Sequence, residues 1–221
     1  TDKRGSSTMT RDMTSLEAEL VKDSLRRLER DAALRRMRLD EQHALTEAHD
    51  QATWYVAAVH PGHEQQVETV LKDIGAEALV PMRKGKQRRR RGRMLPVRDE
   101  VLMTGYVLVR FVSTARALRG LLRLDHVIAI LGGWETPYPV SDEKIAQIMR
   151  KADNGDFDYE RRCDVEVSAG DRVMIGDGIF EGQVGTVVTA NSKGKGDVVV
   201  EVDLFGRLTP MVVPLAVIGK V

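Results

Sequence analysis

The pattern of apolar and polar positions divides the chain into parts of different character. Residues 1–52 hold alternating charges and no Trp, Tyr, Phe or Pro, which favours a helical or mobile extension. Residues 53–150 alternate between strand and helix periods, and residues 169–221 hold short β-type runs between glycine turn signals such as Asp177-Gly178. Residues 151–168 are charged and poor in aliphatic side chains, so we predict a linker there.

The N-terminal helix is expected to begin near Thr14, which stands at capping-box spacing from Glu17. Its apolar seam runs through Val21, Leu25, Leu28, Ala32 and Leu39. Arg35 falls at a core position of this seam, which argues against a stable coiled coil. Two interpretations remain open. The favoured one is a solvated, mobile or single helix, and the other is a helix that docks on a partner.

The middle part is expected to form a ferredoxin-like split βαβ sheet. The expected order is strand 53–59, helix 60–75, strand 77–81, strand 105–111, helix 113–124, strand 126–131 and helix 141–149. This order contains two crossovers, which are right-handed, so both main helices should cover one sheet face. The other face is expected to stay partly free for a partner.

The C-terminal part is expected to form a small five-stranded β-barrel, because five short strand-like runs follow one another at regular spacing. A barrel of fewer than ~60 residues is only marginally stable alone. The predicted fold class is therefore α+β, with an N-terminal helical extension.

Composition narrows the function. The formal net charge is +1, and the only cysteine is Cys163, which excludes a disulfide within one chain. No apolar run approaches the ~18 residues of a membrane span, and the first residues lack the apolar core of a signal peptide, so we expect a cytoplasmic protein. His60 and His63 lie three residues apart without a further ligand cluster. We expect no enzyme, no metal and no cofactor.

One block of charge stands out. From Arg83 to Arg98 there are nine Lys or Arg residues and no acid. The block has no interleaved aromatic residues, so it is suited to phosphate contact rather than base stacking. The alternative is a solvated loop without a binding role. The candidate nucleic-acid contacts are Lys86, Arg88, Arg89, Arg90, Arg91 and Arg93.

A turn near the C-terminus carries an unexpected ring. The stretch "DLFGRLTP" places Phe205 beside Gly206 and Arg207 just after a predicted strand. Turns are usually polar, so an apolar ring beside a guanidinium suggests a docking point for a partner.

Several stretches together resemble one family. "GDRVMIGDGIFEGQVGTV" and "VVVEVDLFGRLTP" resemble the KOW barrel of the NusG family of transcription factors. "TWYVAAVHPGHEQQV", "TGYVLV" and "ILGGWETPYPVSDEKIAQIM" resemble its N-terminal domain, called NGN. The resemblance implies an elongation factor that binds the β′ clamp helices of RNA polymerase, reaches the β subunit and contacts upstream or non-template DNA. It also implies a KOW barrel that recruits NusE or Rho.

Site residues follow from this resemblance by position. The implied polymerase-binding residues are Trp54, Leu102, Met103, Gly105 and Tyr106. The implied KOW partner-binding residues are Ile179, Phe180, Leu204, Phe205, Gly206, Arg207 and Thr209.

Departures from the family pattern refine the expectation. Met103 and Thr104 replace the usual Phe-Pro before Gly-Tyr, and Ile179 replaces the usual Pro. Together with the N-terminal helix and the dense basic loop, these departures indicate a specialised antitermination paralogue. We also expect the protein to be a monomer when free. The alternatives are a general factor that also stimulates Rho-dependent termination and, from another class, a ribosome-associated KOW-type RNA-binding protein.

Overall fold

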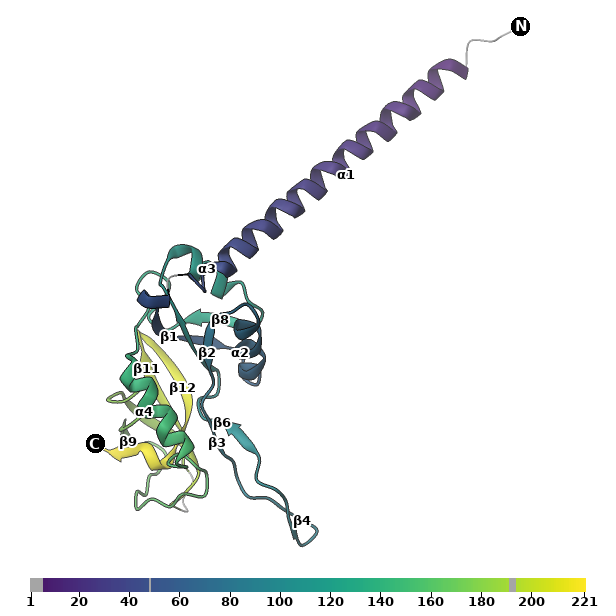
Figure 1. Cartoon of the computed structure of the whole chain (residues 1–221). Helices are drawn as coiled ribbons and strands as arrows, with labels where there is room; N and C mark the ends of the chain where they lie inside the picture. Colours follow the sequence, from purple (N-terminus) through teal and green to yellow (C-terminus); the bar gives the residue numbers. More distant parts are fainter. Residues whose placement is uncertain (1–5, 48, 191–193) are drawn as a thin grey trace.

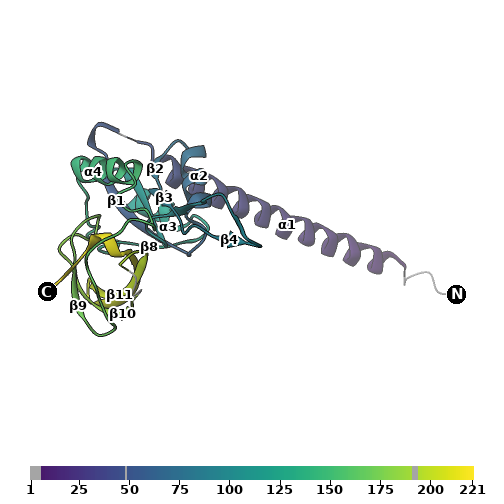
Figure 2. The same cartoon turned by 90° about the horizontal axis from the view of Figure 1, so that it is seen from below.

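The structure, a computed structural model, describes residues 6–47, 49–190 and 194–221, with the side chains of α1 described from residue 21 onward. The long helix α1 (Ser6–His43) projects as a single rod from a body of two packed parts (Figure 1). A view turned by 90° places the C-terminal sheet beside the α/β part, on the side away from α1 (Figure 2). A short 3-10 turn, η1 (His49–Gln51), leads from α1 into the first strand.

The α/β part is built on a four-stranded antiparallel sheet. Its strands are β1 (Thr53–Val59), β2 (Glu77–Leu79), β7 (Tyr106–Phe111) and β8 (Val127–Ile130). They lie in the order β2-β7-β1-β8, with Val56 opposite Leu108 in the central pair. This is the strand order of the predicted ferredoxin-like sheet.

Two helices cover one face of this sheet, as predicted. They are α2 (Glu64–Asp73) and α3 (Ala115–Leu122), whose apolar residues share one core with Tyr55 and Phe111. The Oγ1 atom of Thr114 accepts a hydrogen bond from the Ala117 N–H at 3.1 Å and so caps α3. Both segments were predicted to be amphipathic helices, and both bury apolar residues against the sheet.

The opposite face is covered, and here the prediction was wrong. Trp54, Val56 and Leu108 form a second core with Val140 and Ile145, the latter on α4 (Asp142–Asp153). The α4 helix is longer than predicted and seals the face that the sequence pattern left partly free. Apolar residues on both faces of central strands require such a cover.

The basic block forms a long hairpin instead of a loop. Its base pairs β3 (Met82–Lys84) with β6 (Asp99–Val101), and its tip pairs β4 (Arg89–Arg90) with β5 (Arg93–Met94). Arg91 and Gly92, the two tip residues, both have positive φ angles, 49° and 81°. Two central residues of this kind make a tight hairpin turn. The hairpin extends away from the body (Figure 1).

The five strands predicted for the C-terminal part are present and form one antiparallel sheet. Its elements are β9 (Arg172–Ile175), β10 (Val184–Thr189), β11 (Asp197–Leu204), β12 (Arg207–Pro214), η2 (Leu215–Val217) and β13 (Ile218–Lys220). The strand order is β12-β11-β10-β9-β13. Alternate residues of β11, including Val198, Val200 and Val202, point into a single core.

The predicted linker is packed against both parts. Phe157 is 2% exposed in a cluster with Ile148 of α4, and Val167 lies in the core of the C-terminal sheet. The Cys163 N–H donates to the Gly194 carbonyl at 2.9 Å. The segment therefore helps to hold the two parts together.

Candidate protein-binding site

The turn before β7 carries the residues expected to meet RNA polymerase. Gly105 has a φ of +86°, and its N–H donates to Glu64 Oε1 at 2.6 Å. Glu64 Oε2 accepts a second bond from the Gly62 N–H at 2.9 Å. Glu64, at the start of α2, is 2% exposed, and these two hydrogen bonds fix the conformation of the turn. The adjacent Met103 and Tyr106 are thereby held at a defined position.

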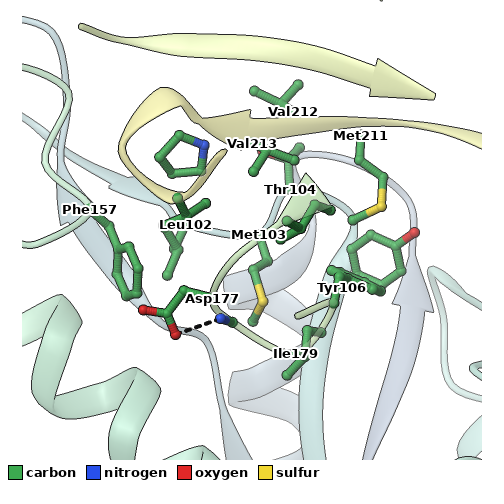
Figure 3. Close-up of a pocket in the computed structure, with 15 residues that line it drawn as sticks. Leu102, Met103, Thr104, Tyr106, Phe157, Asp177, Ile179, Met211, Val212 and Val213 are labelled. Atoms are coloured by element: carbon green, nitrogen blue, oxygen red, sulfur yellow. Dashed lines mark hydrogen bonds between the residues drawn. The ribbon is translucent and has the colours of Figure 1, made fainter. Parts of the chain in front are cut away.

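The C-terminal sheet covers this turn. The rings of Tyr106 and Phe180 meet edge to face with centroids 5.2 Å apart. A small cavity of about 40 Å³ remains between the two parts. Figure 3 shows Leu102, Met103 and Tyr106 facing Ile179 and Met211 across it.

The contact is apolar at its centre. Met103 and Ile179 both pack against the buried cluster of Leu102, Ile148 and Phe157. Burial between the two parts raises the pKa of the Tyr106 phenol above its ordinary value of 10.0. Residues that the sequence assigned to two different partners, Met103 and Tyr106 on one side and Ile179 and Phe180 on the other, are therefore brought into one interface.

Ion pairs surround this apolar centre. Arg83 of β3 makes a bidentate pair with Asp197 of β11, with distances of 2.6 Å and 2.8 Å to the two carboxylate oxygens. The Arg83 side chain is 5% exposed and that of Asp197 is 22% exposed. Bidentate guanidinium–carboxylate bonds are among the stronger and more directional ones in proteins.

The second set of ion pairs extends from α4. Lys151 bonds Asp177, and Lys144 bonds Glu181, both in the loop between β9 and β10. Burial acts to raise the pKa of Asp177, but hydrogen bonds from Lys151 and from the Gly178 N–H, with the nearby lysine charges, lower it overall. Asp177 is therefore charged at neutral pH and holds the loop against α4.

Trp54 lies apart from the other expected polymerase contacts. It is 4% exposed and packs in the core beside Val56 and Leu108. Its carbonyl accepts a hydrogen bond from the Val140 N–H at 2.8 Å. In this structure Trp54 supports the sheet beneath the turn and presents little surface to a partner.

The expected KOW docking residues are split between two places. Ile179 and Phe180 face the α/β part, and Leu204 is buried in its own sheet. Phe205 is 60% exposed, with a φ of 54°, and its ring lies 5.9 Å from that of Tyr138. Gly206 and Arg207 are exposed beside it, and Thr209 is half-buried on β12. The expected docking residues Ile179 and Phe180 are thus covered, and those around Phe205 are open to solvent.

The hairpin tip is the exposed part of the basic block. Lys86, Arg88, Arg89, Arg90, Arg91 and Arg93 are all exposed. The base of the hairpin differs, because Lys84 pairs with Asp99 at 2.6 Å and Arg83 is buried against Asp197. The cationic surface is therefore concentrated on the projecting tip.

In the folded chain His126 lies beside His60 and His63. The rings of His63 and His126 stack with centroids 3.7 Å apart, and His60 lies edge-on to His126 at 6.2 Å. Among the described residues no group of three or more His, Cys, Asp or Glu side chains is placed to hold a metal ion. No helix of the described chain has both the length and the apolar character needed to cross a bilayer.

Three residues of this site were not found from the sequence. Glu64 gave only the signal of an acid in the first turn of a helix, which says nothing of the Gly105 N–H that it holds. Arg83 was counted with the basic block, and Asp197 carried no signal at all. Their pairing joins positions 114 residues apart, and such a contact is visible only once both parts are folded.

Comparison with known proteins agrees with this architecture. The family described as "Transcription termination factor nusG" matches residues 52–149. The Transcription termination/antitermination protein NusG of Pasteurella multocida is 26% identical over 192 residues, covering 80% of this chain and 99% of the relative. That of Xylella fastidiosa strain 9a5c is 28% identical over 185 residues, covering 72% of this chain and 93% of the relative.

Among solved structures, one described as "Domain interaction in Thermotoga maritima NusG" has a TM-score of 0.44 and 22% identity, covering 79% of this chain and 99% of that chain. The two sequence relatives are transcription termination/antitermination proteins by name. The chain is similar to the NusG family over residues 52–149 and to curated NusG proteins over most of their length. The matched family segment starts after α1, so the long N-terminal helix lies outside it.

Proposed function

We propose that this chain, a NusG-type transcription termination/antitermination factor, keeps its polymerase-binding turn closed under its C-terminal sheet until it reaches RNA polymerase. In the open form the turn around Met103 and Tyr106 binds the β′ clamp helices, and the α/β part also reaches the β subunit. The released C-terminal sheet then recruits a second partner, such as NusE or Rho, through Ile179, Phe180 and Phe205.

The observation that carries this proposal is the mutual burial of two surfaces that the sequence assigned to partners. An exposed patch of Met103, Tyr106, Ile179 and Phe180 would leave apolar area in water. The two surfaces cover each other with an edge-to-face ring contact at 5.2 Å. A partner that offers each surface a better apolar contact shifts the equilibrium to the open form.

The projecting hairpin supports contact with nucleic acid in the same complex. Its tip concentrates arginines on a ribbon that extends beyond the body (Figure 1). Arginines without interleaved aromatic residues bind phosphate and carry little base recognition. We assign them to upstream or non-template DNA, where they hold the factor on the elongating complex and favour read-through.

The decisive experiment locks the closed form. In a Cys163→Ser background, Met103→Cys and Ile179→Cys are bridged with a short thiol-specific crosslinker. We expect the bridged protein to lose binding to RNA polymerase and the unbridged double variant to bind. Each single-cysteine variant treated with the same reagent controls for the modification itself. Equal binding by the bridged and unbridged proteins contradicts the proposal.

Antitermination and general NusG activity are separated by one transcription assay with purified Rho and RNA polymerase. The antitermination proposal expects longer transcripts when the protein is added, because the hairpin tip holds the factor on the elongating complex and favours read-through. Termination that moves upstream on addition supports the general factor. Tight binding to ribosomal RNA without polymerase supports the ribosome-associated alternative.

A further inference from the structure

An apolar stripe runs along the exposed part of α1. Its members follow one another at spacings of four, three, four and seven residues: Val21, Leu25, Leu28, Ala32 and Leu39. Val21, Leu25, Leu28 and Leu39 are between 53% and 65% exposed, and Ala32 is exposed as well. Spacings of three and four place these residues on one side of a helix. Leucines exposed in a row, unlike scattered ones, indicate a binding surface.

Packing of α1 on the body does not explain this stripe. At the end of α1, Glu41 is 2% exposed and bonds Arg119 of α3, at 3.2 Å, and Arg123, the residue that follows α3. Gly120 lies so close that a Cβ atom on it would come within 2.3 Å of the Glu41 carbonyl oxygen. Leu39 precedes Glu41 by two positions, a rotation of roughly 200° around a helix. The stripe therefore faces away from the body to which α1 is fixed.

We propose that this stripe binds the same stripe of a second copy of the chain, with the two helices antiparallel. In the best register Leu25 of each copy packs against Leu28 of the other. Val21 of each copy then packs against Ala32, a large residue against a small one. The seam consists of four layers related by a two-fold axis between the leucine pairs. The sequence led us to expect a monomer when free, and the proposed dimer departs from that expectation.

Arg35 selects the antiparallel orientation. In a parallel pair of helices each core residue meets its own counterpart, so Arg35 would face Arg35 across the seam. Two guanidinium groups forced together at an apolar seam repel each other. In the antiparallel register Arg35 lies beyond the four layers and far from its counterpart. The residue that argued against a coiled coil thus argues only against the parallel one.

Charges beside the seam are complementary in the same register. Lys22 of each copy lies beside Glu29 of the other, so the two-fold axis generates two opposite-charge pairs. Ser24 of each copy lies beside Asp31 of the other on the second flank, which places a hydroxyl donor next to a carboxylate. A seam of four layers is short, and we expect a dissociation constant of about 10 µM.

The first test measures the oligomeric state of the full chain by sedimentation over a range of concentrations. We expect a reversible monomer–dimer equilibrium, and we expect Leu28→Asp to weaken it at least about 30-fold. Leu34→Asp is the matched control, because Leu34 is 50% exposed on the same helix but outside the stripe. A chain that stays monomeric at every concentration overturns the proposal. So does a dimer that Leu34→Asp disrupts and Leu28→Asp does not.

Two further variants test the register without altering the apolar seam. Glu29→Lys should weaken the dimer about 10-fold, and the double variant Lys22→Glu/Glu29→Lys should restore it. In a Cys163→Ser background, a mixture of the Val21→Cys and Ala32→Cys chains should form the mixed disulfide on oxidation. Disulfides of Val21→Cys with itself would instead indicate a parallel pair, and they would overturn the proposed orientation.

Discussion

The turn around Tyr106 and the basic hairpin tip lie close in sequence, and both were predicted to bind a partner. In the structure the turn is covered and the tip is exposed. The turn is covered by the C-terminal sheet, with Tyr106 against Phe180. The tip, from Arg88 to Arg93, projects into solvent with its side chains exposed. The difference lies in the chemistry of the two surfaces.

A charged surface is stable in water, because each guanidinium keeps its hydration until a phosphate replaces it. An apolar surface gains free energy from any cover, at about 25 cal/mol per Å² buried. The chain therefore leaves its cationic surface open and covers its apolar one with its own second part. Under the proposed function, binding at the apolar turn depends on opening of the C-terminal sheet, and binding at the cationic tip depends on salt.

The largest expected effect comes from a charge in the covered turn. Tyr106→Asp buries an unpaired carboxylate against whichever apolar surface covers the turn, either the C-terminal sheet or the polymerase. We expect binding to RNA polymerase to fall at least about 100-fold, measured by co-purification and by titration of a labelled chain. The matched control is Trp134→Asp, since Trp134 is an aromatic residue that is 64% exposed outside the turn. If Tyr106→Asp leaves polymerase binding unchanged, the turn is not part of the polymerase-binding site.

The next largest effect is expected from the buried ion pair, and it should differ between variants of Arg83 and of Asp197. Asp197→Ala leaves the buried Arg83 guanidinium with only the more distant Glu100 carboxylate, at 4.0 Å, and we expect it to weaken the packing of the C-terminal sheet on the α/β part by about 2–3 kcal/mol. Arg83→Leu instead leaves a carboxylate that is already 22% exposed, so its effect should be smaller. Closure is measured by amide hydrogen exchange at the Tyr106 turn. Equal protection in both variants and in the unaltered chain would show that this pair does not hold the two parts together.

Sequence alone predicted the elements that follow a strong local period. Helical spacing predicted α2 and α3 as amphipathic helices, and a run of β-type residues predicted β11 as a strand. Glycine signals such as Gly206 marked a turn that the structure contains. In each case the pattern acts within one element, so a single sequence carries it.

The relation between the two parts could not be predicted in the same way. Phe205 was predicted as a docking ring and is exposed, whereas Phe180 was predicted to serve the same surface and is 6% exposed under the α/β part. Trp54 was expected at a partner surface and lies in a core. An apolar side chain satisfies either a core or a partner equally well, and only the fold decides between them.

A smaller effect is expected from the hairpin tip. Replacing the four arginines from Arg88 to Arg91 by Gln should lower affinity for a polymerase–DNA complex about 10-fold and flatten the dependence on salt, by up to about 3 in the logarithmic slope. The same four positions changed to Lys keep the charge, so that variant should retain most of the slope. Affinity is measured at several salt concentrations. An unchanged slope in the Gln variant would show that the tip contacts no phosphate.

The smallest effect is a titration that reports closure directly. Burial raises the pKa of Tyr106 above 10.0 in the closed form, so the neutral phenol favours closure. This contribution is complete below about pH 10 and is lost as the pH rises through the raised pKa, because the phenolate favours the open form. The titration of Tyr106 is obtained from the tyrosinate absorbance of the chain minus that of its Tyr106→Phe variant. In the Asp197→Ala background, where the turn is opened, we expect the difference curve to move to lower pH. Identical curves in both backgrounds would mean that the Arg83–Asp197 pair and the Tyr106–Phe180 contact do not act on the same opening of the C-terminal sheet.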